Sequence, residues 1–168
     1  QAFYVFFVEP LETANGWSEL ALKASPLVLI AQGLALGFRA RIYNIGAEGQ
    51  LLMGAVFASG VAIYTEGMEG VWILPLMVFA GALGGALWGA LPAWLKTHFN
   101  AEETLTTLML TYVATYLLSY LVSGPWRDPG GTNFPQSILF GESAMFLPLF
   151  EGLRLNSSIF ITLLAVPV

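Results

Sequence analysis

Four long apolar stretches, separated by short polar connections, dominate the pattern of the chain. They cover residues 20–38, 42–64, 71–95 and 105–123, and a fifth apolar stretch begins near Ser158. Each of the four approaches or exceeds the roughly 20 mainly apolar residues that a helix needs to cross about 30 Å of hydrocarbon. The stretches are continuous rather than alternating, so they predict membrane-spanning helices and not strands.

The composition agrees with a membrane environment. Hydrophobic residues make up 57% of the chain and charged residues 10%, whereas a soluble domain averages about 25% charged residues. A soluble bundle of buried helices is the alternative, but the polar helix faces that it needs are missing. We therefore predict an all-α polytopic transmembrane helix bundle, with four complete spans and the start of a fifth. The chain starts at Gln1 and stops within an apolar run, so we expect residues 1–168 to be part of one domain truncated at both ends.

The charged residues of the connections alternate in sign along the chain. Arg39 and Arg41 separate the first two stretches, Glu66 and Glu69 follow the second, and Lys96 follows the third. Basic residues mark cytoplasmic connections. We therefore expect the arginines and Lys96 inside, and the acidic turn outside.

The connection after the fourth stretch is long and rich in turn residues. On the same topology, residues 124–157 form an extracytoplasmic loop. Its aromatic residues Trp126 and Phe134 are either anchors at the membrane interface or contacts for a docking partner, and the residues alone leave both open.

The sequence lacks the residues that several kinds of chemistry require. The chain has no cysteine and a single histidine, His98, so we predict no catalytic site, no metal site and no cofactor. It has no GxxxxGK[ST] loop for ATP, and with a net charge of -5 it has no basic stripe for nucleic acid.

The first polar cluster lies at the start of the second apolar stretch, in residues 44–50 (NIGAEGQ). A charge at membrane depth costs a few kcal/mol, and Gly46 and Gly49 weaken a helix there. If the helix restarts near Gly46, Glu48 lies in its first turn, where the helix dipole favours a carboxylate. Glu48 then either locks a broken helix through hydrogen bonds or faces a translocation path. Asn44, Glu48 and Gln50 are therefore candidates for a pathway or a gate.

The second polar cluster, residues 100–109, leads into the fourth apolar stretch. Its simpler interpretation is an acidic first turn that caps a transmembrane helix. The alternative is a re-entrant element near the pathway, which makes Glu103 and Thr107 further candidates.

Glycines at four-residue spacing form a third pattern. Gly81, Gly85 and Gly89 lie on one face of the third predicted helix, and Gly33 and Gly37 on one face of the first. This spacing favours close helix–helix packing in membranes.

Three segments together resemble a known family. Residues 38–51 (FRARIYNIGAEGQL), 103–112 (ETLTTLMLTY) and 124–137 are similar, in order and spacing, to motifs of ABC-importer permeases of the simple-sugar and nucleoside class, which are related to branched-chain amino acid permeases. At Glu102 and Thr111 the chain departs from asparagines that are usual in the family.

The resemblance implies a transmembrane permease subunit with no catalytic residues of its own, in the bacterial plasma (inner) membrane. It implies import of a small molecule, nucleosides first and simple sugars next, by alternating access. Its partners would be an ATP-binding subunit, a second permease subunit and an extracytoplasmic substrate-binding lipoprotein. The residues also allow an ion-coupled transporter or channel using Glu48, or a membrane assembly subunit with no transport role.

Overall fold

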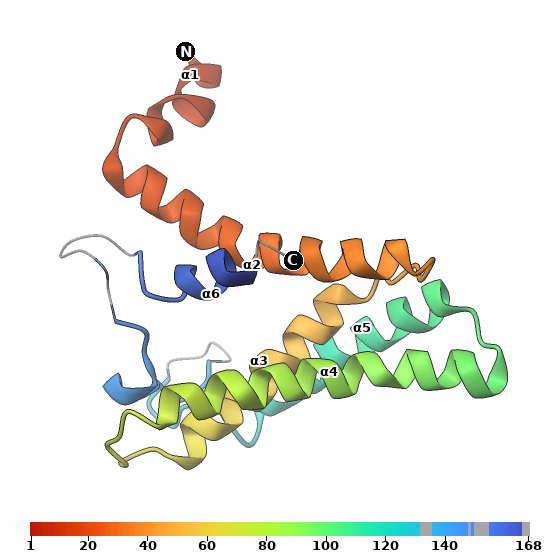
Figure 1. Ribbon diagram of the computed structural model, residues 1–168. Helices are drawn as coiled ribbons and strands as arrows, with labels where there is room; N and C mark the ends of the chain where they lie inside the picture. Colours follow the sequence, from red (N-terminus) through yellow and green to blue (C-terminus); the bar gives the residue numbers. More distant parts are fainter. Residues whose placement is uncertain (132–135, 148, 150–154, 166–168) are drawn as a thin grey trace. The chain divides into compact units, whose positions relative to one another are not determined.

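The computed structural model describes residues 1–131, 136–147, 149 and 155–165, and most of these residues are helical. In these residues no strand forms, and Arg127 and Ser137 make an isolated antiparallel bridge. The predicted all-α class is confirmed. The elements are α1 (Ala2–Phe7), η1 (Glu9–Leu11), α2 (Ala14–Arg39), α3 (Ala47–Tyr64), α4 (Ile73–Phe99), α5 (Glu103–Ser123), η2 (Glu142–Ala144) and α6 (Ile159–Ala165) (Figure 1).

Four of these helices, α2 to α5, are long and apolar enough to cross a membrane, which confirms the four predicted spans. The predicted boundary that bears on the candidate site is the start of the second span. Residues 42–46 are not helical and α3 begins at Ala47, so the predicted start at residue 42 is wrong. The cause is a set of hydrogen bonds that hold these residues in a non-helical conformation, described below.

Two compact units make up the fold, and the first contains residues 1–40 and 146–168. Its α2 starts with a Thr13 cap, whose hydroxyl accepts a hydrogen bond from the Gly16 N–H at 3.1 Å. Pro26 lies inside α2 and removes one backbone hydrogen bond, and α2 is bent in Figure 1. Next to this proline, the Ser25 hydroxyl is hydrogen-bonded to Thr162 of α6.

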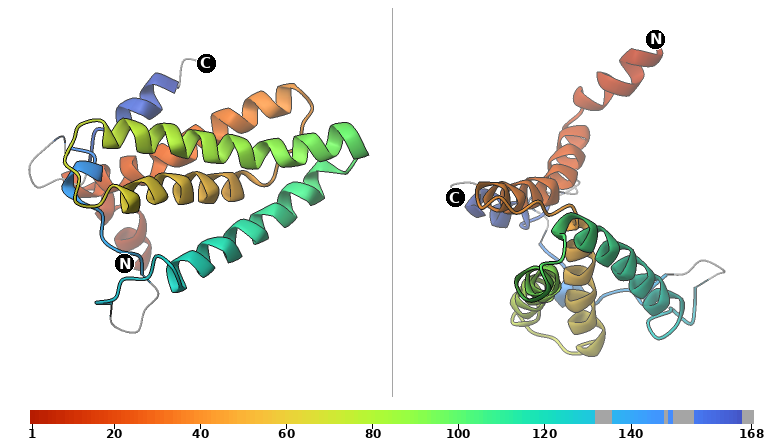
Figure 2. Two further views of the ribbon diagram at one scale, coloured as in Figure 1. Left: turned by 90° about the horizontal axis from the view of Figure 1, so that it is seen from below. Right: turned by 90° about the vertical axis from the view of Figure 1, so that its right-hand side faces the viewer.

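In the second unit, residues 41–145, α3 lies between α4 and α5. Figure 2 shows α4 and α5 joined at one end and diverging from there. Asn100 ends α4 in the left-handed conformation, with φ 52°, and its N–H bonds to the Lys96 carbonyl at 3.0 Å. This cap lets the chain reverse within residues 100–102.

Close backbone contact joins α3 to α4. A Cβ at Gly54 would lie 2.9 Å from the Gly81 carbonyl oxygen, and one at Gly85 would lie 3.2 Å from the Gln50 carbonyl oxygen. Such approach is possible because these positions carry no side chain.

The far end of this unit, away from the α4–α5 connection, carries part of the predicted extracytoplasmic loop. The Trp126 ring lies at van der Waals distance, 3.7 Å, from where a Cβ at Gly60 of α3 would be. The Ser143 hydroxyl donates to the Met68 carbonyl at 3.3 Å, in the turn between α3 and α4. The loop therefore packs on the end of the helices. Phe134 lies outside the described residues.

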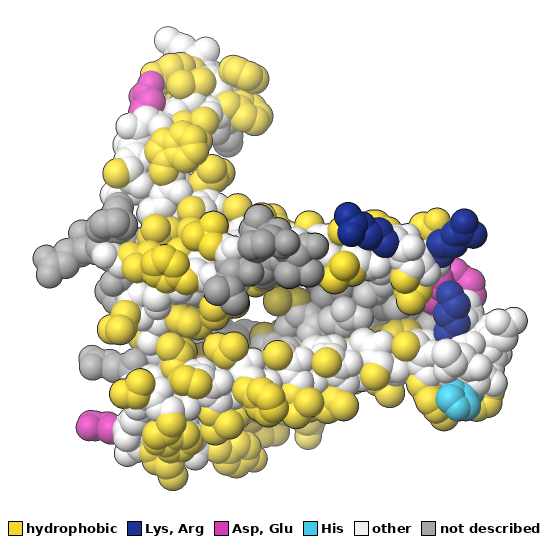
Figure 3. Space-filling model, viewed as in Figure 1, with side chains coloured by type: hydrophobic (Ala, Val, Ile, Leu, Met, Phe, Trp, Pro, Cys, Tyr) yellow, Lys and Arg dark blue, Asp and Glu magenta, His cyan; other side chains and the backbone are white. Residues whose placement is uncertain are grey.

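Apolar side chains cover the outer surface of α4. Its exposed side chains include Leu76, Phe79, Leu83, Leu87 and Leu91. In Figure 3 hydrophobic side chains spread along this helix, whereas charged groups lie towards its ends. This distribution is typical of a helix that crosses a bilayer.

We expect Gly54→Ala to lower the stability of the protein by about 1–3 kcal/mol, the usual cost of overpacking a well-packed contact. The added methyl group would meet the Gly81 backbone, which cannot rotate away. Thermal unfolding of the purified protein in detergent measures the effect.

Gly60→Ala is the matched control, because it is also in α3 and its Cβ would make only ordinary contacts. We expect it to be neutral or slightly stabilising through higher helix propensity. Equal losses in the two variants would contradict the close α3–α4 contact.

Candidate functional site

The candidate site centres on a break in the helical path between α2 and α3, which we call the helix break (residues 41–46). Arg41 has φ 57°, and α3 then begins with Gly46 as its N-cap and Glu48 in its first turn. The predicted restart of the helix near Gly46 is confirmed.

Three backbone N–H groups of the helix break find acceptors on side chains. The Tyr43 N–H donates to Glu103 Oε1 at 3.2 Å, and the Ile45 N–H donates to Thr107 Oγ1 at 3.3 Å. The Gly46 N–H donates to Asn44 Oδ1 at 2.8 Å. Irregular backbone at membrane depth survives only where such groups are satisfied. The structure therefore brings Asn44, Glu103 and Thr107 together to hold the break.

The backbones of α3 and α5 approach each other closely at the same place. A Cβ at Gly46 would lie 2.5 Å from the Thr107 carbonyl oxygen, and a Cβ at Gly49 would lie 2.8 Å from Thr111 Cα. Both distances are too short for a real side chain. Glycine at these positions is thus what allows α5 to reach the break.

Glu102 caps the start of α5. Its carboxylate accepts hydrogen bonds from the Thr104 N–H at 3.2 Å and the Leu105 N–H at 2.9 Å. Hydrogen bonding to Thr104, and then to Leu105, lowers the pKa of Glu102 below its ordinary value of 4.5. The interpretation of this cluster as an acidic helix cap is confirmed.

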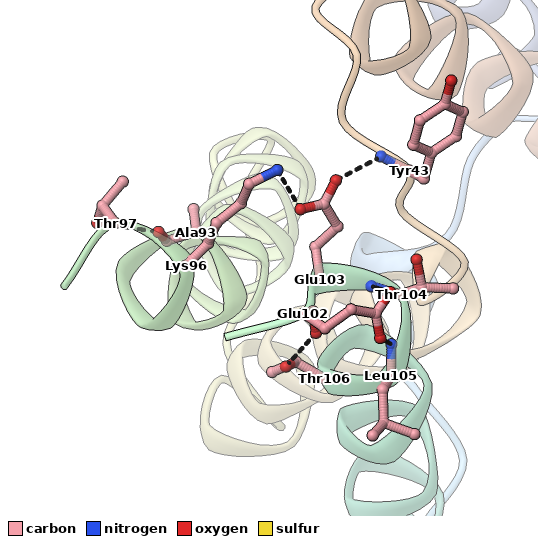
Figure 4. Close-up of polar contacts among 9 residues, drawn as sticks. All are labelled: Tyr43, Ala93, Lys96, Thr97, Glu102, Glu103, Thr104, Leu105 and Thr106. Atoms are coloured by element: carbon pink, nitrogen blue, oxygen red, sulfur yellow. Dashed lines mark hydrogen bonds and ion pairs between the residues drawn. The ribbon is translucent and has the colours of Figure 1, made fainter. Parts of the chain in front are cut away.

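Glu103 links three segments, and we call this arrangement the Glu103 clamp (Lys96, Glu103 and the Tyr43 N–H). One carboxylate oxygen accepts from Tyr43, and the other forms an ion pair with Lys96 at the end of α4 (Figure 4). The Glu103 side chain is 15% exposed, so water screens the pair less than it screens a surface ion pair. The clamp fastens the break to both α4 and α5.

Gln50 turns toward α4 instead of the helix break. A Cβ at Gly89 would lie 3.0 Å from its Nε2 atom. On the neighbouring residue of α4, the indole Nε1 of Trp88 is buried and has no hydrogen-bond partner among the described residues.

Glu48 stands apart from these contacts. Its side chain is exposed, and none of the residues that the structure describes forms a hydrogen bond or an ion pair with its carboxylate. The break is held by other groups, and whether Glu48 lies at a gate or a pathway stays a prediction.

The predicted glycines lie in two different settings. Gly81, Gly85 and Gly89 of α4 lie against α3, whereas no described atom comes within 4 Å of a Cβ built at Gly33 of α2. Gly37 also lies in α2. Packing at Gly33 and Gly37 stays a prediction. In the described part of the chain, no group of three acidic or histidine side chains could hold a metal ion.

Sequence reasoning missed the pairing of Lys96 with Glu103. The sequence did contain a signal for this pair: Lys96 and Glu103 carry opposite charges and lie on the two sides of the short connection between two predicted helices. A reversal of the chain at Asn100 brings such charges face to face.

We expect Thr107→Val to lower stability by about 1–3 kcal/mol, the cost of an unpaired buried polar group, because the Ile45 N–H loses its acceptor. Thr107 is 5% exposed, and valine keeps its shape. Thermal unfolding, with hydrogen exchange of the residue 41–46 amides, measures the loss.

Thr115→Val is the control, because the Thr115 hydroxyl bonds to Thr111 within the same helix. Unchanged exchange at residues 41–46 in Thr107→Val would contradict the tie between α5 and the helix break.

Comparison with known proteins gives a family for this arrangement. A family model described as a branched-chain amino acid transport system permease component matches residues 16–168. A glucose ABC transporter permease protein of Haloferax volcanii is 44% identical over 149 residues, which is 88% of this chain and 38% of that protein. The chain therefore spans less than half the length of this relative, and no solved structure matches it. With four helices long and apolar enough to cross a membrane and a match over nearly its whole length, the chain belongs to the branched-chain amino acid transport system permease family and is a multi-pass membrane protein of the ABC-transporter permease class.

Proposed function

We propose that this chain is part of the transmembrane subunit of an ATP-driven importer that moves a simple sugar by alternating access. The observation that carries the proposal is the 44% identity to a permease named for glucose. That name favours simple sugars over nucleosides as the cargo.

The proposal includes partners and a location. An ATP-binding subunit supplies the energy, a second permease subunit completes the passage, and an extracytoplasmic substrate-binding lipoprotein delivers the sugar. The assembly lies in the bacterial plasma membrane. Membership of an ABC permease family supports this division of roles.

The helix break and the Glu103 clamp form the gating region in this proposal. Basic groups lie here, with Arg41 in the break and Lys96 at the end of α4, whereas Glu66 and Glu69 lie in the turn at the other end. The positive-inside rule supports a cytoplasmic position for the break. Asn44, Glu48, Gln50, Glu103 and Thr107 are then the candidate residues of this gating region.

The proposed function predicts sugar uptake that depends on ATP. The test is uptake of labelled glucose into proteoliposomes that contain the full permease, its ATP-binding subunit and its binding protein. Vanadate should stop uptake, and an ionophore that collapses ion gradients should leave it unchanged. The reverse pattern would support ion coupling instead, and competition by uridine but not by glucose would point to nucleosides.

We expect Glu48→Gln to lower uptake while the melting temperature stays nearly constant. The described structure gives the carboxylate no partner, so its loss costs at most the 0.3–1 kcal/mol, roughly, of a charge near a helix N-terminus. Glu69→Gln, in the turn at the other end of the unit, is the control. Normal uptake with a clear loss of thermal stability would indicate a structural role for Glu48.

A further inference from the structure

Three tyrosines form a stripe along the outer surface of α5. Tyr112, Tyr116 and Tyr120 follow one another at four-residue spacing, which places them on one side of the helix. They are 59%, 75% and 66% exposed. We call this stripe the tyrosine face.

The tyrosine face points away from α3. The opposite side of α5 carries the buried residues Thr107 and Ala114, and Thr111 lies against Gly49 of α3. The helix thus has one side that packs within its unit and one side that presents phenol groups. Among the described residues, no hydrogen bond to the three tyrosine hydroxyls is present.

The depth of the tyrosines is unusual for side chains that face lipid. At 1.5 Å per residue, Tyr112 lies about 14 Å and Tyr116 about 20 Å from the start of α5, within a hydrocarbon layer about 30 Å thick. Lipid-facing tyrosines gather at the membrane surfaces, where their hydroxyls reach water. A phenol near the middle of the bilayer needs a polar partner that lipid tails do not provide.

The outer surface of α4 provides the contrast. Its exposed positions Leu83, Leu87 and Leu91 carry only hydrocarbon, as a lipid contact requires. On α5 the corresponding surface carries the three phenols among the exposed apolar side chains of Leu105, Met109 and Val113. The exposed Ser119 adds a further hydroxyl. The phenols at mid-span are therefore what distinguishes this side of α5 from the outer surface of α4.

We infer that the tyrosine face lines the passage of the permease and contacts the sugar directly. This inference rests on the proposed import of a sugar. A pyranose has hydroxyl groups at its edge and C–H groups on its faces, and a tyrosine offers a hydroxyl and an aromatic face to match. The four-residue spacing gives the sugar successive contacts of the same kind along the helix.

Cysteine accessibility tests the position of the tyrosine face, because residues 1–168 contain no cysteine and any cysteine elsewhere in the full permease is first replaced by serine. Tyr112→Cys, Tyr116→Cys and Tyr120→Cys are made singly in the full permease with its partners, and a charged methanethiosulfonate reagent is added from water. Leu87→Cys, exposed near the middle of α4, is the matched control. We expect the three variants to react faster than the control, and glucose to slow their reaction.

Uptake kinetics test the chemistry of the contact. We expect Tyr116→Phe to raise KM about fivefold, as for one lost hydrogen bond, with an unchanged melting temperature. We expect Tyr116→Leu to raise KM further, because it also removes the ring. A lowered melting temperature with unchanged KM would instead show that the tyrosine packs against another helix.

The outcomes separate this inference from the proposed function. If the unmodified complex imports glucose but the tyrosine variants react no faster than Leu87→Cys, the inference is wrong and the function stands. Reaction that uridine slows and glucose does not would overturn the sugar contact. If the unmodified complex imports no sugar, the proposed function fails before any variant is made.

Discussion

The backbone N–H groups of the helix break, which no helical carbonyl satisfies, are the constraint on which the rest of the second unit depends. Between α2 and α3 the chain leaves the helix, and the N–H groups that this frees need acceptors elsewhere. Two of those groups, on Tyr43 and Ile45, are satisfied by Glu103 and Thr107, which both belong to α5. The break therefore exists only with α5 beside it and in this rotation, since a shift of one residue would turn each acceptor by about 100°.

The need to bring α5 so close explains the small residues of α3. Gly46 and Gly49 remove the side chains that would collide with Thr107 and Thr111, and Gly54 does the same on the side that faces Gly81 of α4. Helix α3 is thus in backbone contact with both neighbours. Its glycines serve close packing there, which offsets their low helix propensity.

Local features of this fold could be predicted from the sequence. The contacts between residues of different helices could not. Average hydropathy locates the spans, and the glycines beside Glu48 indicate where α3 restarts, because both depend on neighbouring residues alone. The acceptors of the break and the pairing of Lys96 with Glu103 depend on which helices lie side by side and on their rotation. Hydropathy also hides the tyrosine face, since an average over the span does not record that its tyrosines share one side.

Helix α5 carries both the threonine and glutamate that hold the break and the tyrosine face, so the two are mechanically connected. A tilt of α5 during the proposed alternating access would either break the bonds to Tyr43 and Ile45 or carry the helix break with it. Breaking them would leave two N–H groups without their side-chain acceptors, each at a cost of about 0.5–1.5 kcal/mol, the usual net worth of a hydrogen bond. If α5 and the helix break move together, the bonds from Tyr43 and Ile45 to Glu103 and Thr107 are kept, and the backbone rotates only where the chain enters and leaves these segments. The lower-cost motion is therefore one in which the helix break travels with α5, so that a change at the tyrosine face reaches the opposite end of the helix through rigid contacts.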